Sequence, residues 1–130
     1  MAFIFQNPNP LYVLVGDCVI RAIAIATDRE WDDVYLDLIY QGFQMKDMPS
    51  SNAVWEAFLR KHKFKKYLIP NTCPDCYKIS DFCRDNPRGT FLASTGTHLV
   101  AVKDGNWLDT WNSGSELMTS FWRKEEVNVK

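Results

Sequence analysis

The pattern of apolar residues changes once along the chain, near Gly89, and this change constrains the fold more than any other feature. Before Gly89, apolar residues recur at helical spacing. After it, they form short β-type runs, two of which flank Asp104-Gly105. Helices followed by hairpin strands are typical of α+β proteins. The sequence therefore predicts an N-terminal helical layer packed on a C-terminal antiparallel β-sheet.

The expected elements follow from this pattern and from local start and stop signals. We expect Asp17 to cap the first helix and Thr27-Asp28 to end it, and Gly42 to end the second. The prolines at 7–10 should keep that segment extended. The expected helices are 17–28, about 30–40, a helix that starts after 49–52 and has its last turn at 60–63, and about 78–85. The expected strands are 67–69, 90–94, 98–102 and 107–111.

Composition limits the class of protein. The chain has 130 residues, of which 46% are hydrophobic and 14% aromatic, so we expect one folded domain over 1–130. A net charge of −1 predicts no nucleic-acid partner and no attraction to anionic membranes. No apolar run approaches the roughly 20 residues of a membrane span, and no secretory signal opens the chain. Four cysteines in such a chain are expected to be reduced, which predicts a cytoplasmic protein.

Cys18 and His98 are the candidate reactive groups. Cys18 lies one residue inside the expected helix start, where the helix dipole lowers the pKa of a thiol. His98 lies in a strand-like run, and an imidazole beside a thiol can take its proton. The alternatives are a small core cysteine and a strand histidine with its hydrogen bonds satisfied. We favour a nucleophile and its base.

The hairpin around Asp104-Gly105 predicts which carboxylate orients His98. A two-residue type I′ turn there pairs 103 with 106, 102 with 107 and 100 with 109. Side chains alternate between faces, so Asp109 lies on the His98 face, within hydrogen-bonding reach. Asn112 would point to the other face. Trp107 and Trp111 share the Asp109 face, and we expect them to wall a cleft, or to be plain core.

The motifs around these three residues resemble a known family. Gly16-Asp17-Cys18-Val19-Ile20-Arg21-Ala22, Gly96-Thr97-His98 and the run at 104–111 look like those of small papain-like cysteine peptidases of gut bacteria and their phages. The similarity also covers 48–55 and 71–76, and extends at superfamily level to papain and the double-glycine-leader peptidases. It implies a Cys18-His98-Asp109 triad, in the chain order of papain-like nucleophiles.

One position departs from that family. Papain-like peptidases place a glutamine six residues before the cysteine, as a side-chain donor to the oxyanion hole, and Tyr12 stands there. Asn9, Asn7 or Gln6 could serve instead, and we favour Asn9. The backbone N–H of Cys18 would be the second donor.

The remaining cysteines and the basic run have simpler interpretations. Cys73 and Cys76 have the spacing of a zinc knuckle, but a structural zinc needs four ligands and no second close pair is present. A thioredoxin-like role would require a βαβ pattern, so we expect the two thiols to pack a loop, with no metal and no cofactor. The basic residues at 60–66 could touch phosphate or an acidic partner; a charged helix end is the commoner meaning.

The sequence therefore predicts a thiol hydrolase that acts on a peptide, isopeptide or amide bond of a peptide or protein substrate. Two alternatives stay open. One is a binding module without catalysis, such as a phage or bacterial factor aimed at a host protein. The other is an acyltransferase or amidase on the same fold. The sequence does not predict the oligomeric state.

Overall fold

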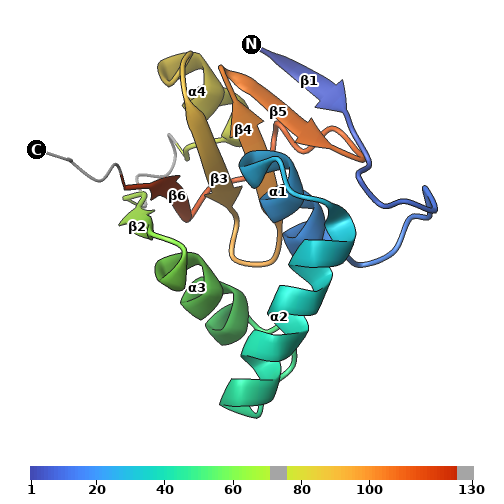
Figure 1. Ribbon diagram of the computed structural model, residues 1–130. Helices are drawn as coiled ribbons and strands as arrows, with labels where there is room; N and C mark the ends of the chain where they lie inside the picture. The colour runs from blue at the N-terminus through green and yellow to red at the C-terminus, as the bar shows by residue number, and fades with distance from the viewer. Residues whose placement is uncertain (71–75, 126–130) are drawn as a thin grey trace, which may run out of the picture.

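The computed structural model describes residues 1–70 and 76–125, which form an α+β fold (Figure 1). Within these residues, four helices accompany one six-stranded sheet. The helices are α1 (Cys18–Thr27), α2 (Trp31–Met45), α3 (Asn52–Lys61) and α4 (Ile79–Asp85). The strands are β1 (Ala2–Phe5), β2 (Phe64–Leu68), β3 (Thr90–Ser94), β4 (Leu99–Lys103), β5 (Asn106–Asp109) and β6 (Ser120–Lys124). No helix among the described residues is both long enough and apolar enough to cross a bilayer.

The sheet is mixed, with the strand order β1-β5-β4-β3-β6-β2. Strands β2 to β6 pair antiparallel, but β1 runs parallel to β5, with Ala2 opposite Asn106 and Phe5 opposite Asp109. The expectation of a purely antiparallel sheet is therefore wrong at this edge. Both β1 and β6 are absent from the sequence prediction. Each is a short strand whose partners are distant in the chain, so no local turn signal announces it.

The helix predictions hold closely for α1, α3 and α4. Asp28, in the left-handed conformation at φ 55°, ends α1 as expected. The Asp17 side chain does not cap α1; it binds other side chains instead. Gly42 does not end α2, which continues to Met45 and closes on Lys46. A Cβ at Gly42 would lie 2.7 Å from the backbone oxygen of Asp47. The absence of a side chain at Gly42 therefore allows the loop after α2 to pack directly against the helix.

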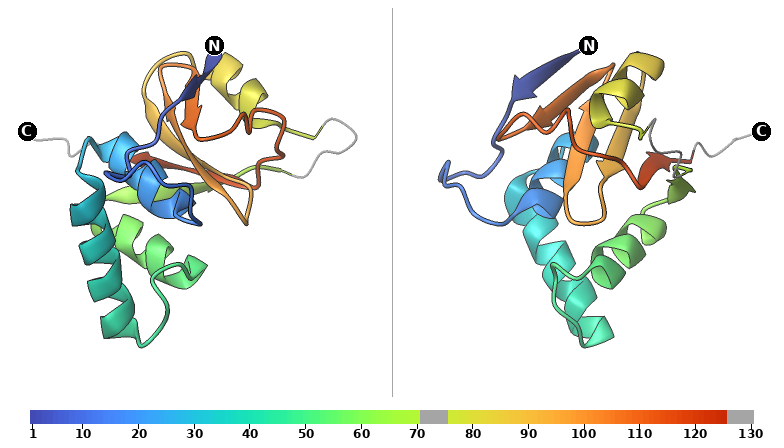
Figure 2. Two further views of the ribbon diagram at one scale, coloured as in Figure 1. Left: turned by 90° about the vertical axis from the view of Figure 1, so that its right-hand side faces the viewer. Right: turned by 180° about the vertical axis from the view of Figure 1, so that it is seen from behind.

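Helices cover both faces of the sheet (Figure 2). The layer of α1, α2 and α3 packs on one face, as the sequence predicts, while α4 lies against the other (Figures 1 and 2). Alternate residues of β4 divide between the two resulting cores: Leu99 and Ala101 join the first, whereas Val100 and Val102 join the second. This alternation is the period of two that a strand imposes. Trp122 on β6 is fully buried in the first core.

The predicted hairpin register is present in β4 and β5. Asp104 and Gly105 both have positive φ, 50° and 78°, as a type I′ turn requires. Lys103 pairs with Asn106 and Val102 with Trp107. The paired region ends at Ala101 opposite Leu108. His98 precedes the first residue of β4 and Asp109 is the last residue of β5, so both lie at the open end of the hairpin, next to α1.

Candidate active site

Cys18 is the first residue of α1 and its thiol is partly exposed. The first N–H groups of a helix have no partner within the helix. Because the Asp17 side chain makes no cap hydrogen bond, these groups remain beside the thiol. The helix start therefore provides both partial positive charge and hydrogen-bond donors at the sulfur.

His98 is held at both its backbone and its ring. The backbone N–H of His98 donates to Oγ1 of Thr95, 3.1 Å away, and its carbonyl accepts from the Thr95 N–H, 3.0 Å away. The ring atom Nε2 lies 2.7 Å from Oδ2 of Asp109. This contact leaves Nδ1 as the ring nitrogen available to the Cys18 thiol. The ring of Trp111 lies 5.0 Å from the His98 ring.

Asp109 is 3% exposed, and its carboxylate contacts four groups. Oδ2 accepts from Ser113 Oγ at 2.8 Å in addition to its contact with His98. Oδ1 accepts from the Thr110 N–H at 2.7 Å and lies 3.2 Å from the guanidinium of Arg21. A carboxylate with this many donors is kept ionised and has no freedom to rotate away from the histidine.

The pKa values of the three groups shift in the directions a thiolate–imidazolium pair needs. For Cys18, burial raises the pKa, but hydrogen bonds to His98 and to the Leu99 backbone, with the nearby positive charges, lower it overall. For His98, burial lowers the pKa, but hydrogen bonds to Asp109 and Cys18 raise it to about 9. Burial also raises the pKa of Asp109, and its hydrogen bonds to His98, Ser113 and Thr110 lower it overall. The pKa shifts of Cys18 and His98 are both in the direction that favours a negative sulfur beside a positive ring.

Arg21 joins this site to the start of α1 through a buried chain of charges. Its guanidinium binds the Asp17 carboxylate one turn earlier and the Asp109 carboxylate on β5. The other oxygen of Asp17 accepts from Nε1 of Trp31 at 2.9 Å. Both carboxylates and the guanidinium are almost fully buried, so each charge depends on the others for its neutralisation.

A cavity of about 490 Å³ opens beside Cys18 and His98. Its walls come from the start of α1, the inner face of α2, the segment before α3 and the loop between β3 and β4. Among the lining residues are Tyr35, Leu38, Pro49, Asn52, Trp55 and Thr97. Asn52 fixes the mouth, because its Nδ2 donates to the Gly96 carbonyl at 3.2 Å and its Oδ1 accepts from Trp55 Nε1 at 2.9 Å.

The other predicted site residues lie outside this cavity lining. The side chain of Asn9 is buried, and its Oδ1 accepts the N–H of Leu11 in a tight turn. Trp107 is not a cleft wall: it is buried in the core between the sheet and α4. Its Nε1 donates to Oδ1 of Asn112 at 2.9 Å, so the Asn112 side chain lies on the Trp107 side of the sheet, and the expectation that it points to the other face is wrong. Trp111 is partly exposed and shields one side of the His98 ring.

The remaining cysteines differ from Cys18. Cys83 is buried, and burial raises the pKa of its thiol to about 11. Cys76 is disulfide-bonded, so the expectation of four reduced thiols is wrong there. Cys73 lies outside the described residues. Within 1–70 and 76–125, no group of three or more His, Cys, Asp or Glu side chains could hold a metal ion.

Sequence reasoning missed three residues that support the site. Arg21 carries a usable signal, because it follows Asp17 by four residues on a helix, the spacing of an ion pair. Asn52 stands in a motif that the sequence analysis used only as a helix start. Ser113 lies in an irregular segment, so no periodicity directs its hydroxyl to Asp109.

The chain was compared with known proteins at three levels. It matches no protein-family model, no curated protein sequence and no solved structure. The functional assignment therefore depends on the geometry of the site itself.

Proposed function

We propose that this protein is a papain-like thiol hydrolase that cleaves peptide, isopeptide or amide bonds with Cys18, His98 and Asp109. One observation carries the proposal: Cys18 at the start of α1 and His98, whose Nε2 lies 2.7 Å from Oδ2 of Asp109, line the same cavity. A thiol with an activated, accessible sulfur is a nucleophile, whereas a buried structural cysteine such as Cys83 is inert. The thiol lies in the helical layer and Asp109 in the sheet, which is the division that the resemblance to papain-like peptidases implies, and this supports the proposal.

The first half of the reaction transfers the acyl group to the enzyme. The Cys18 sulfur attacks the substrate carbonyl carbon, and a C–S bond forms as the carbonyl oxygen gains the electron pair. The His98 imidazolium then donates its proton to the leaving nitrogen, the C–N bond breaks, and an acyl-thioester remains on Cys18. Asp109 keeps Nε2 of His98 engaged, so that Nδ1 faces the reacting atoms.

The second half releases the acid. Neutral His98 removes a proton from water, the water oxygen attacks the thioester carbonyl, and the C–S bond breaks to restore the thiolate. Both tetrahedral intermediates carry an oxyanion that requires hydrogen-bond donors. The backbone N–H of Cys18 at the uncapped start of α1 is the donor we assign first.

The cavity lining favours substrates in which the residue that supplies the acyl group is uncharged and largely apolar. The lining residues of α2 and α3, Tyr35, Leu38 and Trp55, present aromatic and aliphatic surface. The charged side chains near the site, Asp17 and Arg21, are already paired with each other. A charged substrate side chain would therefore enter without a counter-charge and lose its hydration.

The test is to trap the acyl-enzyme. Purified protein is incubated with activated thioesters and with a library of short peptide amides that end in apolar, acidic or basic residues, and its intact mass is followed. We expect acyl adducts on Cys18 and product release with apolar residues at the acyl position. Cys18→Ala should form no adduct, whereas the matched control Cys83→Ala, which removes the other free thiol of the described residues, should behave like the wild type.

Two outcomes would replace the proposal with its alternatives. Fast alkylation of Cys18 with no turnover of any thioester, peptide or amide would favour the binding module. Acyl transfer to an added amine in preference to water would favour the acyltransferase. If Cys83 is alkylated faster than Cys18 in the folded protein, the activated-thiol assignment itself fails.

We predict that the side chain of Asn9 is the second oxyanion donor. The Asn9→Ala variant should lower turnover by about 10²-fold, the usual loss for one such donor, while leaving iodoacetamide alkylation of Cys18 unchanged. Alkylation forms no oxyanion, so it separates the donor from the thiolate. Full turnover by Asn9→Ala would assign the role to Asn7, Gln6 or Tyr12, or to backbone groups alone.

A further inference from the structure

Helix α2 has apolar residues on two faces, and only one of them is covered. Val34, Leu38 and Gly42 are buried against α1 and α3. The opposite face carries Leu36, Ile39, Tyr40 and Phe43, which are 63%, 39%, 58% and 67% exposed. We call these four residues the α2 stripe. A surface helix usually carries polar side chains on its outer face, so the stripe needs an explanation.

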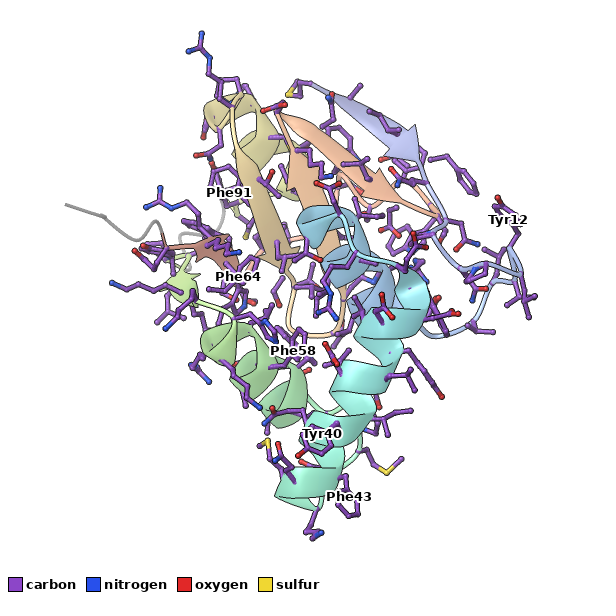
Figure 3. All side chains as sticks on the ribbon, in the orientation of Figure 1. Tyr12, Tyr40, Phe43, Phe58, Phe64 and Phe91 are labelled. Atoms are coloured by element: carbon purple, nitrogen blue, oxygen red, sulfur yellow. The ribbon has the colours of Figure 1, made fainter. Side chains whose placement is uncertain are left out.

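The spacing of the α2 stripe is that of a helix-pairing seam. Its members follow one another by three, one and three positions, which places them in one line along the helix. Figure 3 labels Tyr40 and Phe43 on the part of α2 that extends away from the sheet, where no other described element lies over them. The stripe is therefore accessible over its whole length.

Charges of opposite sign stand at the two ends of the α2 stripe. Asp33 lies one helical turn before Leu36, in the first turn of α2. Lys46 closes the helix, and its Nζ lies over the Phe43 ring, 4.0 Å from the centroid. The stripe thus has an acidic end and a basic end, and an antiparallel copy of the same helix presents the opposite charge at each end.

We propose that a second copy of this chain covers the α2 stripe, with the two α2 helices antiparallel about a two-fold axis. In this register Leu36 meets the partner's Phe43, and Ile39 meets the partner's Tyr40. Asp33 then meets the partner's Lys46 at each end. A parallel arrangement would place Asp33 against the partner's Asp33, which is repulsive. A two-fold axis repeats every contact, so the one stripe supplies both halves of the interface.

One further pair of charged residues meets in this register. Asp32 would approach the partner's Asp47, a like-charge contact. The Asp47 carboxylate, however, accepts hydrogen bonds from the Met48 N–H at 2.7 Å and from Ser51 Oγ at 3.0 Å within its own chain. Its charge is therefore partly satisfied and held toward the loop.

The test is the oligomeric state of the full chain, measured by sedimentation equilibrium and light scattering at concentrations up to roughly 200 µM. We expect a reversible monomer–dimer equilibrium. The substitutions Phe43→Glu and Leu36→Glu should each raise the dimer Kd by about tenfold or more, as replacement of an apolar interface contact by a buried charge does. Leu68→Glu, a matched change of a residue that is 77% exposed on β2, should leave the Kd unchanged.

A charge swap distinguishes the antiparallel dimer from nonspecific association through exposed apolar residues and from binding of a different protein. Asp33→Lys alone and Lys46→Asp alone should each weaken the dimer, because each creates like-charge contacts. The double variant Asp33→Lys with Lys46→Asp should restore it. A chain that is monomeric throughout, a dimer unaffected by the α2 stripe variants, or a double variant no better than the singles would each overturn the proposal. Circular dichroism establishes that each variant is folded.

Discussion

Arg21 on α1 binds Oδ1 of Asp109 at 3.2 Å, while Oδ2 of the same carboxylate binds His98 at 2.7 Å. One aspartate therefore connects the helix that carries Cys18 to the ring that activates it. Arg21 lies one turn after Cys18, so a displacement of α1 relative to β5 would disturb both contacts together. The thiol and the imidazole are held in register by this shared carboxylate.

Removal of Arg21 should destabilise the fold strongly. Arg21→Gln leaves the buried carboxylate of Asp17 without its counter-charge and removes one of the two cations beside Asp109, and breaking such a buried pair costs about 3–5 kcal/mol. Urea unfolding measures the loss. The matched control is Arg84→Gln, because Arg84 is exposed and solvent screens its pairs with Asp81 and Asp85, so their loss should change the stability little. Equal effects of the two substitutions would contradict the shared-carboxylate role.

Cys18 should react with iodoacetamide below the pH at which an ordinary thiol reacts. Its lowered pKa means that thiolate is present above that pKa and is lost only as the pH falls through it. His98→Ala removes the hydrogen bond and the positive charge that lower the pKa. The alkylation rate at pH 6.5 should then fall by about tenfold for each unit of pKa increase. Alkylation quenched at successive times, followed by peptide mapping, gives the rate at each cysteine. An unchanged Cys18 rate in His98→Ala would show that His98 does not activate the thiol.

His98 should remain protonated through neutral pH and lose its proton near pH 9. Its folded pKa is raised above the value of about 6.5 expected in the unfolded chain. The stabilisation from this pairing is therefore complete below about pH 6.5 and is lost as the pH rises through 9. Long-range ¹⁵N NMR of the imidazole reports the titration directly. A midpoint near 6.5 in the folded protein would contradict the Asp109 and Cys18 contacts.

Substitutions at Asp109 and Asn112 should have different effects on turnover. Asp109→Asn keeps the shape but removes the charge, and Asp109→Ala removes the contact, so both should slow the reaction by about 10² to 10⁴-fold while leaving residual activity. Asn112→Ala should leave turnover unchanged, because Oδ1 of Asn112 accepts from Trp107 in the core beside α4, whereas it is Asp109 that contacts His98. A larger effect from Asn112→Ala than from Asp109→Ala would reverse the assignment of the orienting residue.

Gly114 should tolerate no side chain. A Cβ there would lie 2.5 Å from Cζ2 of Trp107, whose ring is fixed in the core by its hydrogen bond to Asn112. Gly114→Ala should therefore reduce the free energy of unfolding by about 1–3 kcal/mol, the usual cost of overpacking. Thermal unfolding of Gly114→Ala beside Gly16→Ala gives the comparison, because no atom lies within 4 Å of a Cβ at Gly16.

The sequence predicts elements whose signals are local. The type I′ turn at Asp104-Gly105 fixes the hairpin register, and that register correctly brings Asp109 to His98. Strand β1 has no such signal, because its partner β5 lies about a hundred residues away in the chain. The helix stop at Gly42 fails for a related reason: the glycine serves a contact with Asp47 that only the folded loop creates.

The site illustrates the same limit. Cys18, His98 and Asp109 follow from order and parity, whereas the Arg21–Asp109 contact joins two elements that no local pattern connects. The prediction that Trp107 forms a cleft wall is wrong, because strand alternation predicts which face of the sheet a side chain lies on but not which helix covers that face. Helix α4 lies over that face, and the ring becomes core.

The separation of the two halves of the site has a consequence for how the protein matures. Cys18 is in α1, but the groups that lower its pKa, His98 and the Leu99 backbone, belong to a loop and strand some eighty residues later. A chain that has formed α1 alone carries a sulfur without those partners. Reactivity at Cys18 is therefore a report of completed tertiary structure, and the rate at which an alkylating probe labels it can be used to time the closing step of folding.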